Sequence, residues 1–149
     1  MNGRKRHLLV DSQGLLLEAV VHTANIQDRD GAELVLSQGK HREGGRWLRR
    51  LKLIWVDSNY GGKFVQWVQK AYGWTLEVVQ HVDAHKHNRE KKGFVVLPRR
   101  WVIERTFGWL TRYRRLARDY EGLLLTSEVL IYAAMSSLML RRLARGACY

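Results

Sequence analysis

The stretch RRWVIERTFGWLTRYRRLARDYE, residues 99–121, determines how the rest of this chain is interpreted. It follows Pro98, and proline is tolerated just before a helix or in its first turn, whereas no proline interrupts the stretch itself. At 3.6 residues per turn its apolar residues fall on one side, as in a helix that lies on a core. That side consists of Val102, Trp109, Leu110, Tyr113, Leu116, Ala117 and Tyr120. We therefore predict a helix that begins here.

The opposite side of the predicted helix is basic and carries one carboxylate, Glu104. Its members are Arg100, Glu104, Gly108, Thr111, Arg115 and Arg118, with Arg105, Arg112 and Arg114 at the flanks. One interpretation is an exposed ion pair between Glu104 and Arg100, which contributes only about 0.2–0.5 kcal/mol. The other is that the arginines bind nucleic-acid phosphates while the carboxylate binds a divalent metal beside them. A second carboxylate elsewhere in the chain would favour the metal site.

The composition is that of a basic globular protein. Its 149 residues, 46% of them hydrophobic, suffice for one domain with a core. The formal charge of +12 favours a polyanionic partner, and the interleaving of arginine with Trp and Tyr favours nucleic acid over an anionic membrane. The single cysteine, Cys148, excludes an internal disulfide and a cysteine-cluster zinc site.

No segment of the sequence predicts export or membrane insertion. The longest apolar run, residues 129–140, is interrupted by Ser136 and Ser137 and is shorter than the ~20 residues that span a bilayer. Residues 1–14 lack the apolar core of a signal peptide. We therefore expect a cytoplasmic, nucleoid-associated protein without membrane contact.

The elements predicted along the chain form one α/β domain. Residues 3–11 and 15–23 predict a β-hairpin around the turn signal Asp11-Ser12-Gln13-Gly14. Asp28-Arg29-Asp30-Gly31 offers capping residues for a helix over 32–38, which Gly39 would end. The remaining predicted elements are strands over 51–57, 75–82 and 94–97, a helix over 63–72 that stops at Gly73, a charged loop over 83–93, and a last helix to about Ala144 that Ser127 and Glu128 would cap.

Asp57 is the candidate partner of Glu104. It ends the predicted strand over 51–57, and open α/β sheets place functional groups at the carboxyl ends of their strands. Two-metal phosphoryl chemistry requires carboxylates that converge on cations about 3.5–4 Å apart. Convergence of these two acids is a hypothesis that sequence spacing alone does not prove.

Several segments, in order along nearly the whole chain, resemble one known family. They are residues 3–7 (GRKRH) with Val10-Asp11, residues 23–31 (TANIQDRDG), residues 55–57 (WVD) with residues 60–63 (YGGK), residues 97–110 (LPRRWVIERTFGWL), residues 114–116 (RRL) and residues 119–121 (DYE). Together they resemble the catalytic region of bacterial insertion-sequence transposases, the DDE family of the insertion-sequence-four and insertion-sequence-five superfamily.

The resemblance implies a ribonuclease H-like fold, in which a mixed sheet is flanked by helices and three acids hold two Mg²⁺ ions, with Mn²⁺ able to substitute. By position, Asp57 is similar to the second acid and Glu104 to the third. Arg100 matches the arginine of the family signature near the glutamate. Thr111 stands where a further basic residue is expected, with Arg112 next to it.

The first acid of the family lies on a strand upstream of the segment over residues 3–7, where this sequence begins. We therefore expect the first acid, the first sheet strand and the amino-terminal DNA-binding region to be absent. Asp11 is a candidate substitute, but it matches the family's hairpin-turn aspartate.

The resemblance implies a DNA transposase that cleaves the ends of a mobile element, joins them to target DNA, and acts as a homo-oligomer on double-stranded DNA. Asp57 and Glu104 would be catalytic and would ligate Mg²⁺. Trp101 is a candidate for stacking on an exposed base. The predicted phosphate contacts are Arg100, Arg105, Arg112, Arg114 and Arg115.

Three alternatives stay open. The chain could be a catalytically inactive DNA-binding remnant, the downstream frame of a split transposase completed by frameshifting, or a ribonuclease H-like nuclease that acts on RNA. Asp83, His85 and His87 suggest a metal cluster, but their four basic neighbours favour a solvated loop near DNA. The other histidines, His7, His22, His41 and His81, have no assigned role.

Overall fold

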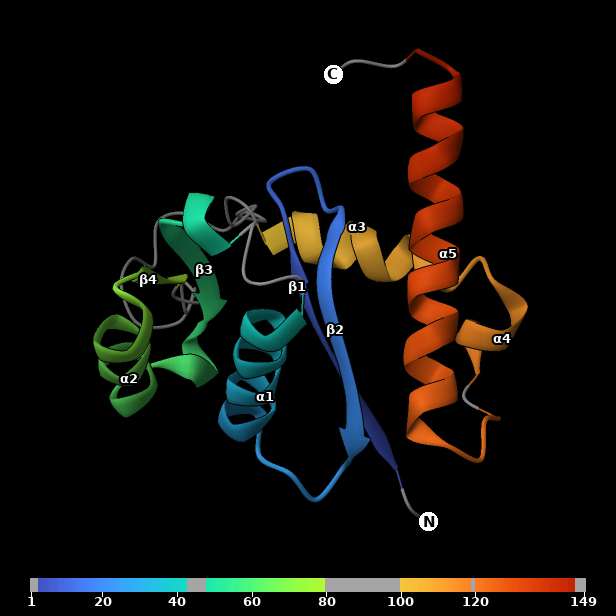
Figure 1. Ribbon diagram of the computed structural model, residues 1–149. Helices are drawn as coiled ribbons and strands as arrows, with labels where there is room; N and C mark the ends of the chain where they lie inside the picture. Colours follow the sequence, from blue (N-terminus) through green and yellow to red (C-terminus); the bar gives the residue numbers. More distant parts are fainter. Residues whose placement is uncertain (1–2, 43–47, 80–99, 119, 147–149) are drawn as a thin grey trace, which may run out of the picture. The chain divides into compact units, whose positions relative to one another are not determined.

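The computed structural model describes the chain apart from residues 1–2, 43–47, 80–99, 119 and 147–149. The chain divides into two compact units: unit 1 comprises Met1–Gly45 and Val102–Tyr149, and unit 2 comprises Arg46–Trp101. Unit 1 contains an antiparallel two-stranded sheet and unit 2 a parallel one, and each sheet is accompanied by helices (Figure 1). The described elements confirm the predicted α/β class.

Unit 1 is built on the predicted β-hairpin. Strand β1 (Arg4–Val10) pairs with β2 (Leu16–Thr23) in an antiparallel register, with a bulge between Leu9 and Val10. Successive side chains of a strand point to opposite faces. Helices on both sides of the hairpin, α1 and α5, contact β2 (Figure 1), which is why this strand is almost entirely buried.

Helix α1 (Asp28–His41) is longer at both ends than the predicted helix over 32–38. The segment predicted to cap it forms its first turn instead, where Asp28 and Asp30 interact favourably with the helix dipole. Gly39, which was predicted to end the helix, lies inside it and is buried. The predicted helix was therefore right in type and wrong in its ends.

Gly31 allows α1 to approach the hairpin closely. The rings of His7 on β1 and His22 on β2 stack with their centroids 4.7 Å apart. A Cβ on Gly31 would lie 2.5 Å from the Nε2 atom of each ring, so any larger residue would displace one of them. The buried Nε2 of His22 has no hydrogen-bond partner among the described residues. The two histidines, which have no role in the sequence-based prediction, thus form the contact between hairpin and α1.

The histidine pair predicts that unit 1 loses stability in mild acid. Burial lowers the pKa of His7 below its ordinary 6.5, His22 lowers it further, Asp28 raises it, and Lys5 lowers it. Because the unfolded chain binds more protons at His7 than the folded chain does, stability present above pH 6.5 is lost as the pH falls toward and below the folded pKa. Urea unfolding followed by circular dichroism from pH about 8 to about 5 is expected to show this decline. His7→Phe is expected to flatten it; an equally steep decline in that variant would contradict the assignment.

The helix predicted from residue 99 onward is interrupted. Helix α3 (Arg100–Leu110) ends, and α4 (Arg114–Ala117) begins after a turn over 111–113. The break lets Leu110 and Leu116 enter the same core. The expectation of one continuous helix was wrong because tertiary packing overrode the local helical pattern.

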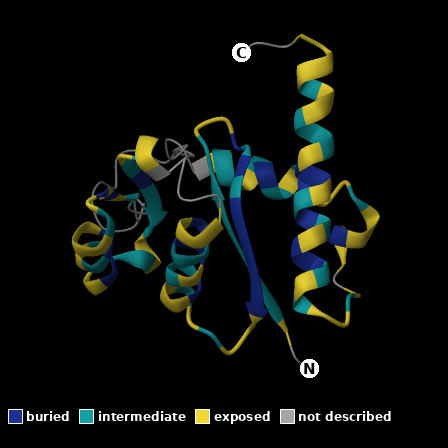
Figure 2. Cartoon of the chain, viewed as in Figure 1, coloured by how far each residue is buried: buried dark blue, intermediate teal, exposed yellow. Residues whose placement is uncertain are grey.

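Helix α5 (Leu124–Ala144) supplies much of the core of unit 1. Ile131, Ala134 and Met135 are buried and pack with Ala19 and Val21 of β2. Figure 2 shows this buried side against the hairpin, whereas the C-terminal turns of the helix are mostly exposed. By length and composition alone the helix could also cross a bilayer, but the core helix of a soluble protein passes the same test.

Ser127 and Glu128 do not cap α5, contrary to the prediction, because the helix already begins at Leu124. Both are buried and bind the hairpin instead. The Arg4 guanidinium donates to Ser127 Oγ at 3.3 Å, and the backbone N–H of Val21 donates to a Glu128 carboxylate oxygen at 2.9 Å.

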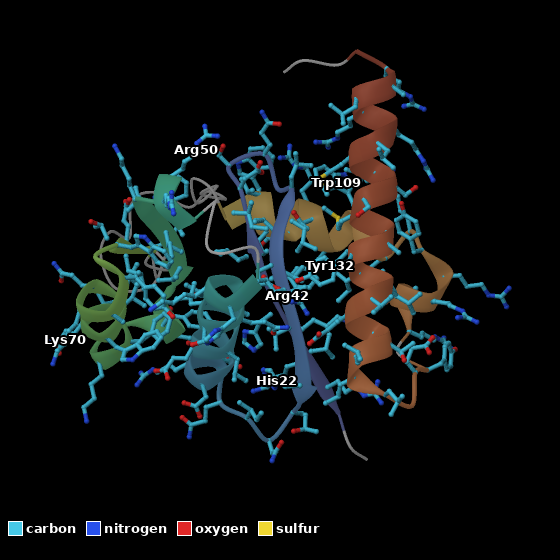
Figure 3. All side chains as sticks on the ribbon, viewed as in Figure 1. His22, Arg42, Arg50, Lys70, Trp109 and Tyr132 are labelled. Atoms are coloured by element: carbon cyan, nitrogen blue, oxygen red, sulfur yellow. The ribbon has the colours of Figure 1, made fainter. Side chains whose placement is uncertain are left out.

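One turn further along α5, Tyr132 binds the same strand (Figure 3). Its hydroxyl accepts a hydrogen bond from the N–H of Ala19 at 3.0 Å and donates to the buried carboxylate of Glu18, which Arg42 approaches to 3.2 Å. Burial, together with the hydrogen bond to Glu18, raises the pKa of Tyr132 to about 12. Glu128 and Tyr132 therefore cover N–H groups that an edge strand would otherwise expose.

Unit 2 contains the predicted strand, turn and helix. Strand β3 (Leu53–Asp57) leads through the 3₁₀ turn η3 (Ser58–Tyr60) into α2 (Lys63–Tyr72), which ends at Gly73 with a φ of +71°. These bounds confirm the predicted helix, while the strand begins two residues later than predicted. A further 3₁₀ turn, η2 (Leu48–Arg50), precedes it.

Strand β4 (Thr75–Val79) lies parallel to β3. It confirms the start of the strand predicted over 75–82, whose last three residues lie outside the described part of the chain. The predicted loop over 83–93 and the predicted strand over 94–97 also lie outside it.

Candidate active site

Asp57 stands at the carboxyl end of β3, as the strand pattern predicts. Its Oδ1 accepts hydrogen bonds from the backbone N–H of Ser58 at 2.5 Å and from Ser58 Oγ at 3.0 Å. These bonds orient the carboxylate, as hydrogen bonds do for carboxylates that ligate metals. They also cap the turn η3, so Asp57 has a structural role as well.

Glu104 lies exposed on α3, and the residues that follow it attach this helix to the hairpin turn. Thr106 Oγ1 donates to the carbonyl of Gly14 at 2.7 Å, and Arg105 donates to the carbonyl of Gln13 at 2.5 Å. Gly14 has a φ of +79°, and a Cβ there would lie 2.7 Å from Thr106 Oγ1, so the turn requires glycine on both grounds. The hairpin turn therefore sets the position of Glu104 within unit 1.

The sequence did not identify Thr106 and Gly14 as positioning residues. Thr106 is completely buried, and its hydroxyl bridges the Gly14 carbonyl and the Val102 carbonyl one turn back. The available signal was a small polar residue on the side of the helix between its apolar and basic faces. That signal does not specify a partner 92 positions away.

The arginines assigned to phosphate binding differ in their surroundings. Arg112 and Arg114 are exposed. Arg115 is also exposed, and its Nη1 lies 3.9 Å from Glu121, a separation at which a surface ion pair contributes little. The side chain of Arg100 lies outside the described part of the structure. The fifth, Arg105, is engaged within unit 1.

Trp109 brings two arginines together. The guanidinium of Arg105 lies 4.9 Å from the Trp109 ring centre, and that of Arg142 on α5 lies 4.4 Å from it (Figure 3). Cation–π contacts of this kind link α3 to α5. Trp101, the candidate for base stacking, is about half exposed.

The basic residues of β1 bind elements of unit 1. Lys5 Nζ lies 2.9 Å from a carboxylate oxygen of Asp28 at the start of α1. Arg6 donates to the carbonyl of Leu116 on α4 at 2.8 Å, and Arg4 donates to the carbonyl of Gly122 at 3.0 Å. Part of the positive charge of the chain is therefore used to hold helices and connections to the hairpin.

Asp11 closes the hairpin turn: its Oδ1 accepts from the N–H groups of Gln13 at 2.9 Å and Leu15 at 2.8 Å. We expect Asp11→Ala to lower the free energy of unfolding by about 1 kcal/mol, because both bonds are lost. Asp11→Asn keeps an acceptor and should lose less. Neither variant should change Mn²⁺ affinity measured by electron paramagnetic resonance; loss of Mn²⁺ binding in Asp11→Asn would make Asp11 a ligand instead.

The two candidate acids belong to different units, Asp57 to unit 2 and Glu104 to unit 1. A site that contains both therefore requires residues from both units. Within the described residues, no group of three or more His, Cys, Asp or Glu side chains could hold a metal ion. Asp83, His85 and His87 lie outside those residues.

Comparison with known proteins adds a family match. The model of a family described as "transposase DDE domain" matches residues 1–139. A protein of Burkholderia cepacia, described as a transposase for insertion sequence element IS402, is 27% identical over 121 residues. The alignment covers 80% of this chain and 54% of that protein, so the chain spans about half the length of this relative. No solved structure gives a significant match.

Proposed function

Because the chain belongs to the insertion-sequence DDE transposase family, we propose that it carries catalytic residues of a DNA transposase, with Asp57 and Glu104 in the active site. We further propose that the two units form one ribonuclease H-like domain in which both carboxylates reach a common cation. The observation that supports this best is the Asp57 carboxylate, held by Ser58 at the end of β3. That is where α/β sheets place functional groups.

The donor set fits a hard divalent cation, which DDE transposases generally use. Both proposed ligands are carboxylates, and oxygen ligands suit Mg²⁺ and Mn²⁺ better than softer metals. When bound, such ions polarise the attacking and leaving oxygens of a phosphodiester displacement. Asp57 and Glu104 would hold the ions, and the bonds from Ser58 would orient Asp57.

The proposed reaction has two displacements. In the first, a water oxygen forms a bond to phosphorus at the end of the element, the bond from phosphorus to the 3′ oxygen breaks, and that oxygen leaves as a 3′-hydroxyl. In the second, this hydroxyl attacks a phosphodiester of the target, whose own 3′ oxygen leaves. Arg112, Arg114 and Arg115 would contact phosphate oxygens and neutralise charge that develops on them.

DNA binding can be tested with a labelled duplex and fluorescence anisotropy at several salt concentrations. Replacing Arg112, Arg114 and Arg115 by Ala should reduce the slope of log affinity against log salt by about 2 to 3, because each lost phosphate contact removes about 0.9. A control variant with Lys40, Lys63 and Lys70 replaced by Ala removes the same charge from α1 and α2. Equal slopes in the two variants would contradict the proposed interface.

The chemistry can be tested by nicking of a supercoiled plasmid with Mg²⁺ or Mn²⁺. We expect metal-dependent nicking that Asp57→Asn and Glu104→Gln both abolish. The second candidate function, a DNA-binding module without chemistry, is favoured by the exposed Arg112 and Arg114. Salt-dependent binding without nicking would support that module and contradict catalysis. Faster cleavage of RNA than of DNA would favour a ribonuclease.

A further inference from the structure

Helix α5 has an apolar stripe on the side that faces away from the hairpin. Four of its large side chains, Leu125, Val129, Leu140 and Leu143, are 57–77% exposed. The exposed small residues Ala133 and Ser136 lie between them. We define the α5 stripe by these six positions: Leu125, Val129, Ala133, Ser136, Leu140 and Leu143.

The α5 stripe is continuous and uncharged. Its steps of three and four residues keep the six side chains within about 80° around the helix, since each residue turns the helix by about 100°. The buried positions of α5, such as Ile131 and Ala134, are centred on the other side. Arg141 and Arg145 also lie off the stripe by this geometry. A surface without charge is unsuited to DNA, so it needs an occupant other than the proposed substrate.

We propose that the α5 stripe pairs with the α5 stripe of a second copy of this chain, with the two helices antiparallel. The order of side chains is the same when read from either end: a large pair, two small residues, and a large pair. An antiparallel two-fold arrangement therefore sets Ala133 opposite Ser136 and Val129 opposite Leu140 of the partner copy. Small residues at the crossing allow the helices to approach, and identical patches that complement themselves are the requirement for a two-fold dimer.

The size of the α5 stripe predicts a weak dimer. Eighteen residues of helix span about 27 Å, and with a helix diameter of about 10–12 Å the stripe covers on the order of 300 Å² per copy. This is the size of the apolar patches that mark interaction sites, and less than half of the about 800 Å² per partner in a standard stable interface. We therefore expect dissociation in the micromolar range. A membrane-spanning α5 would have to detach Ser127 and Glu128 from the hairpin.

Sedimentation equilibrium of the full chain at several concentrations tests the proposal, which does not depend on the transposase function. We expect a monomer–dimer equilibrium, and Val129→Glu should weaken it at least tenfold. The control is Leu123→Glu, because Leu123 precedes α5, is exposed, and lies off the α5 stripe. A wild-type chain that stays monomeric, or equal effects of the two variants, would overturn the proposal.

A double variant tests the antiparallel direction. In Val129→Glu with Leu140→Lys, the new charges face each other between copies only if the helices are antiparallel, so dimerisation should recover relative to Val129→Glu alone. Parallel helices would set Glu against Glu and give no recovery. Circular dichroism should show an unchanged helix content in each variant. Binding of the monomer to phosphatidylcholine vesicles, lost in Val129→Glu, would assign the stripe to a lipid surface and overturn pairing.

Discussion

Asp57→Asn is expected to lower the affinity of the chain for Mn²⁺ at least tenfold, and Glu104→Gln is expected to do the same. Both changes keep the size of the side chain and remove the negative charge that a hard cation requires. Changes to groups that merely orient metal ligands already cost 10- to 100-fold, so loss of a ligand should cost no less. Electron paramagnetic resonance of free Mn²⁺ measures this without relying on DNA cleavage.

A matched control separates ligation from general charge. Asp30→Asn removes one carboxylate from the exposed first turn of α1 and should leave Mn²⁺ affinity unchanged. Ser58→Ala should give an intermediate loss, because it removes the hydroxyl bond to Asp57 but keeps the backbone one. If only one of the two acids affects Mn²⁺, a shared cation is excluded and the proposed active site fails with it.

Ile131→Ala is expected to lower the free energy of unfolding by about 3 kcal/mol. Ile131 has no exposed surface, and it packs where α5 meets β2, Leu110 and Leu116. Truncation removes buried methyl groups and leaves a cavity, which together typically cost about 2–5 kcal/mol. Urea unfolding monitored by circular dichroism gives the value directly.

The control for Ile131→Ala is Leu123→Ala, just before the same helix. Leu123 is 70% exposed, so its truncation should change stability by less than about 0.5 kcal/mol. A cost below about 1 kcal/mol for Ile131→Ala would mean that α5 does not form the core of unit 1.

Elements whose signals are local could be predicted from the sequence. Helix α2 matched its predicted bounds because its apolar spacing and the left-handed Gly73 lie within one short segment. The hairpin was predicted because Asp11 to Gly14 carries its own turn chemistry. Asp57 was found for the same reason, since a strand and the turn after it were both visible in the sequence.

Features that depend on distant contacts could not be predicted. Glu128 has the sequence context of a helix cap, yet it binds Val21, 107 positions away. The interruption between α3 and α4 follows from the placement of Leu110 and Leu116 in one core. The attachment of Glu104's helix to the hairpin through Thr106 and Gly14 is likewise a long-range contact.

The covering of β2 by Glu128 and Tyr132 gives the hairpin a direction of growth. Main-chain pairing on that side would first have to break the bonds to Val21 and Ala19. In the described residues no strand lies on the other side of β1. Any additional strand, from this polypeptide or another, can therefore join the sheet of unit 1 only alongside β1, and insertion there would leave the α5 core untouched.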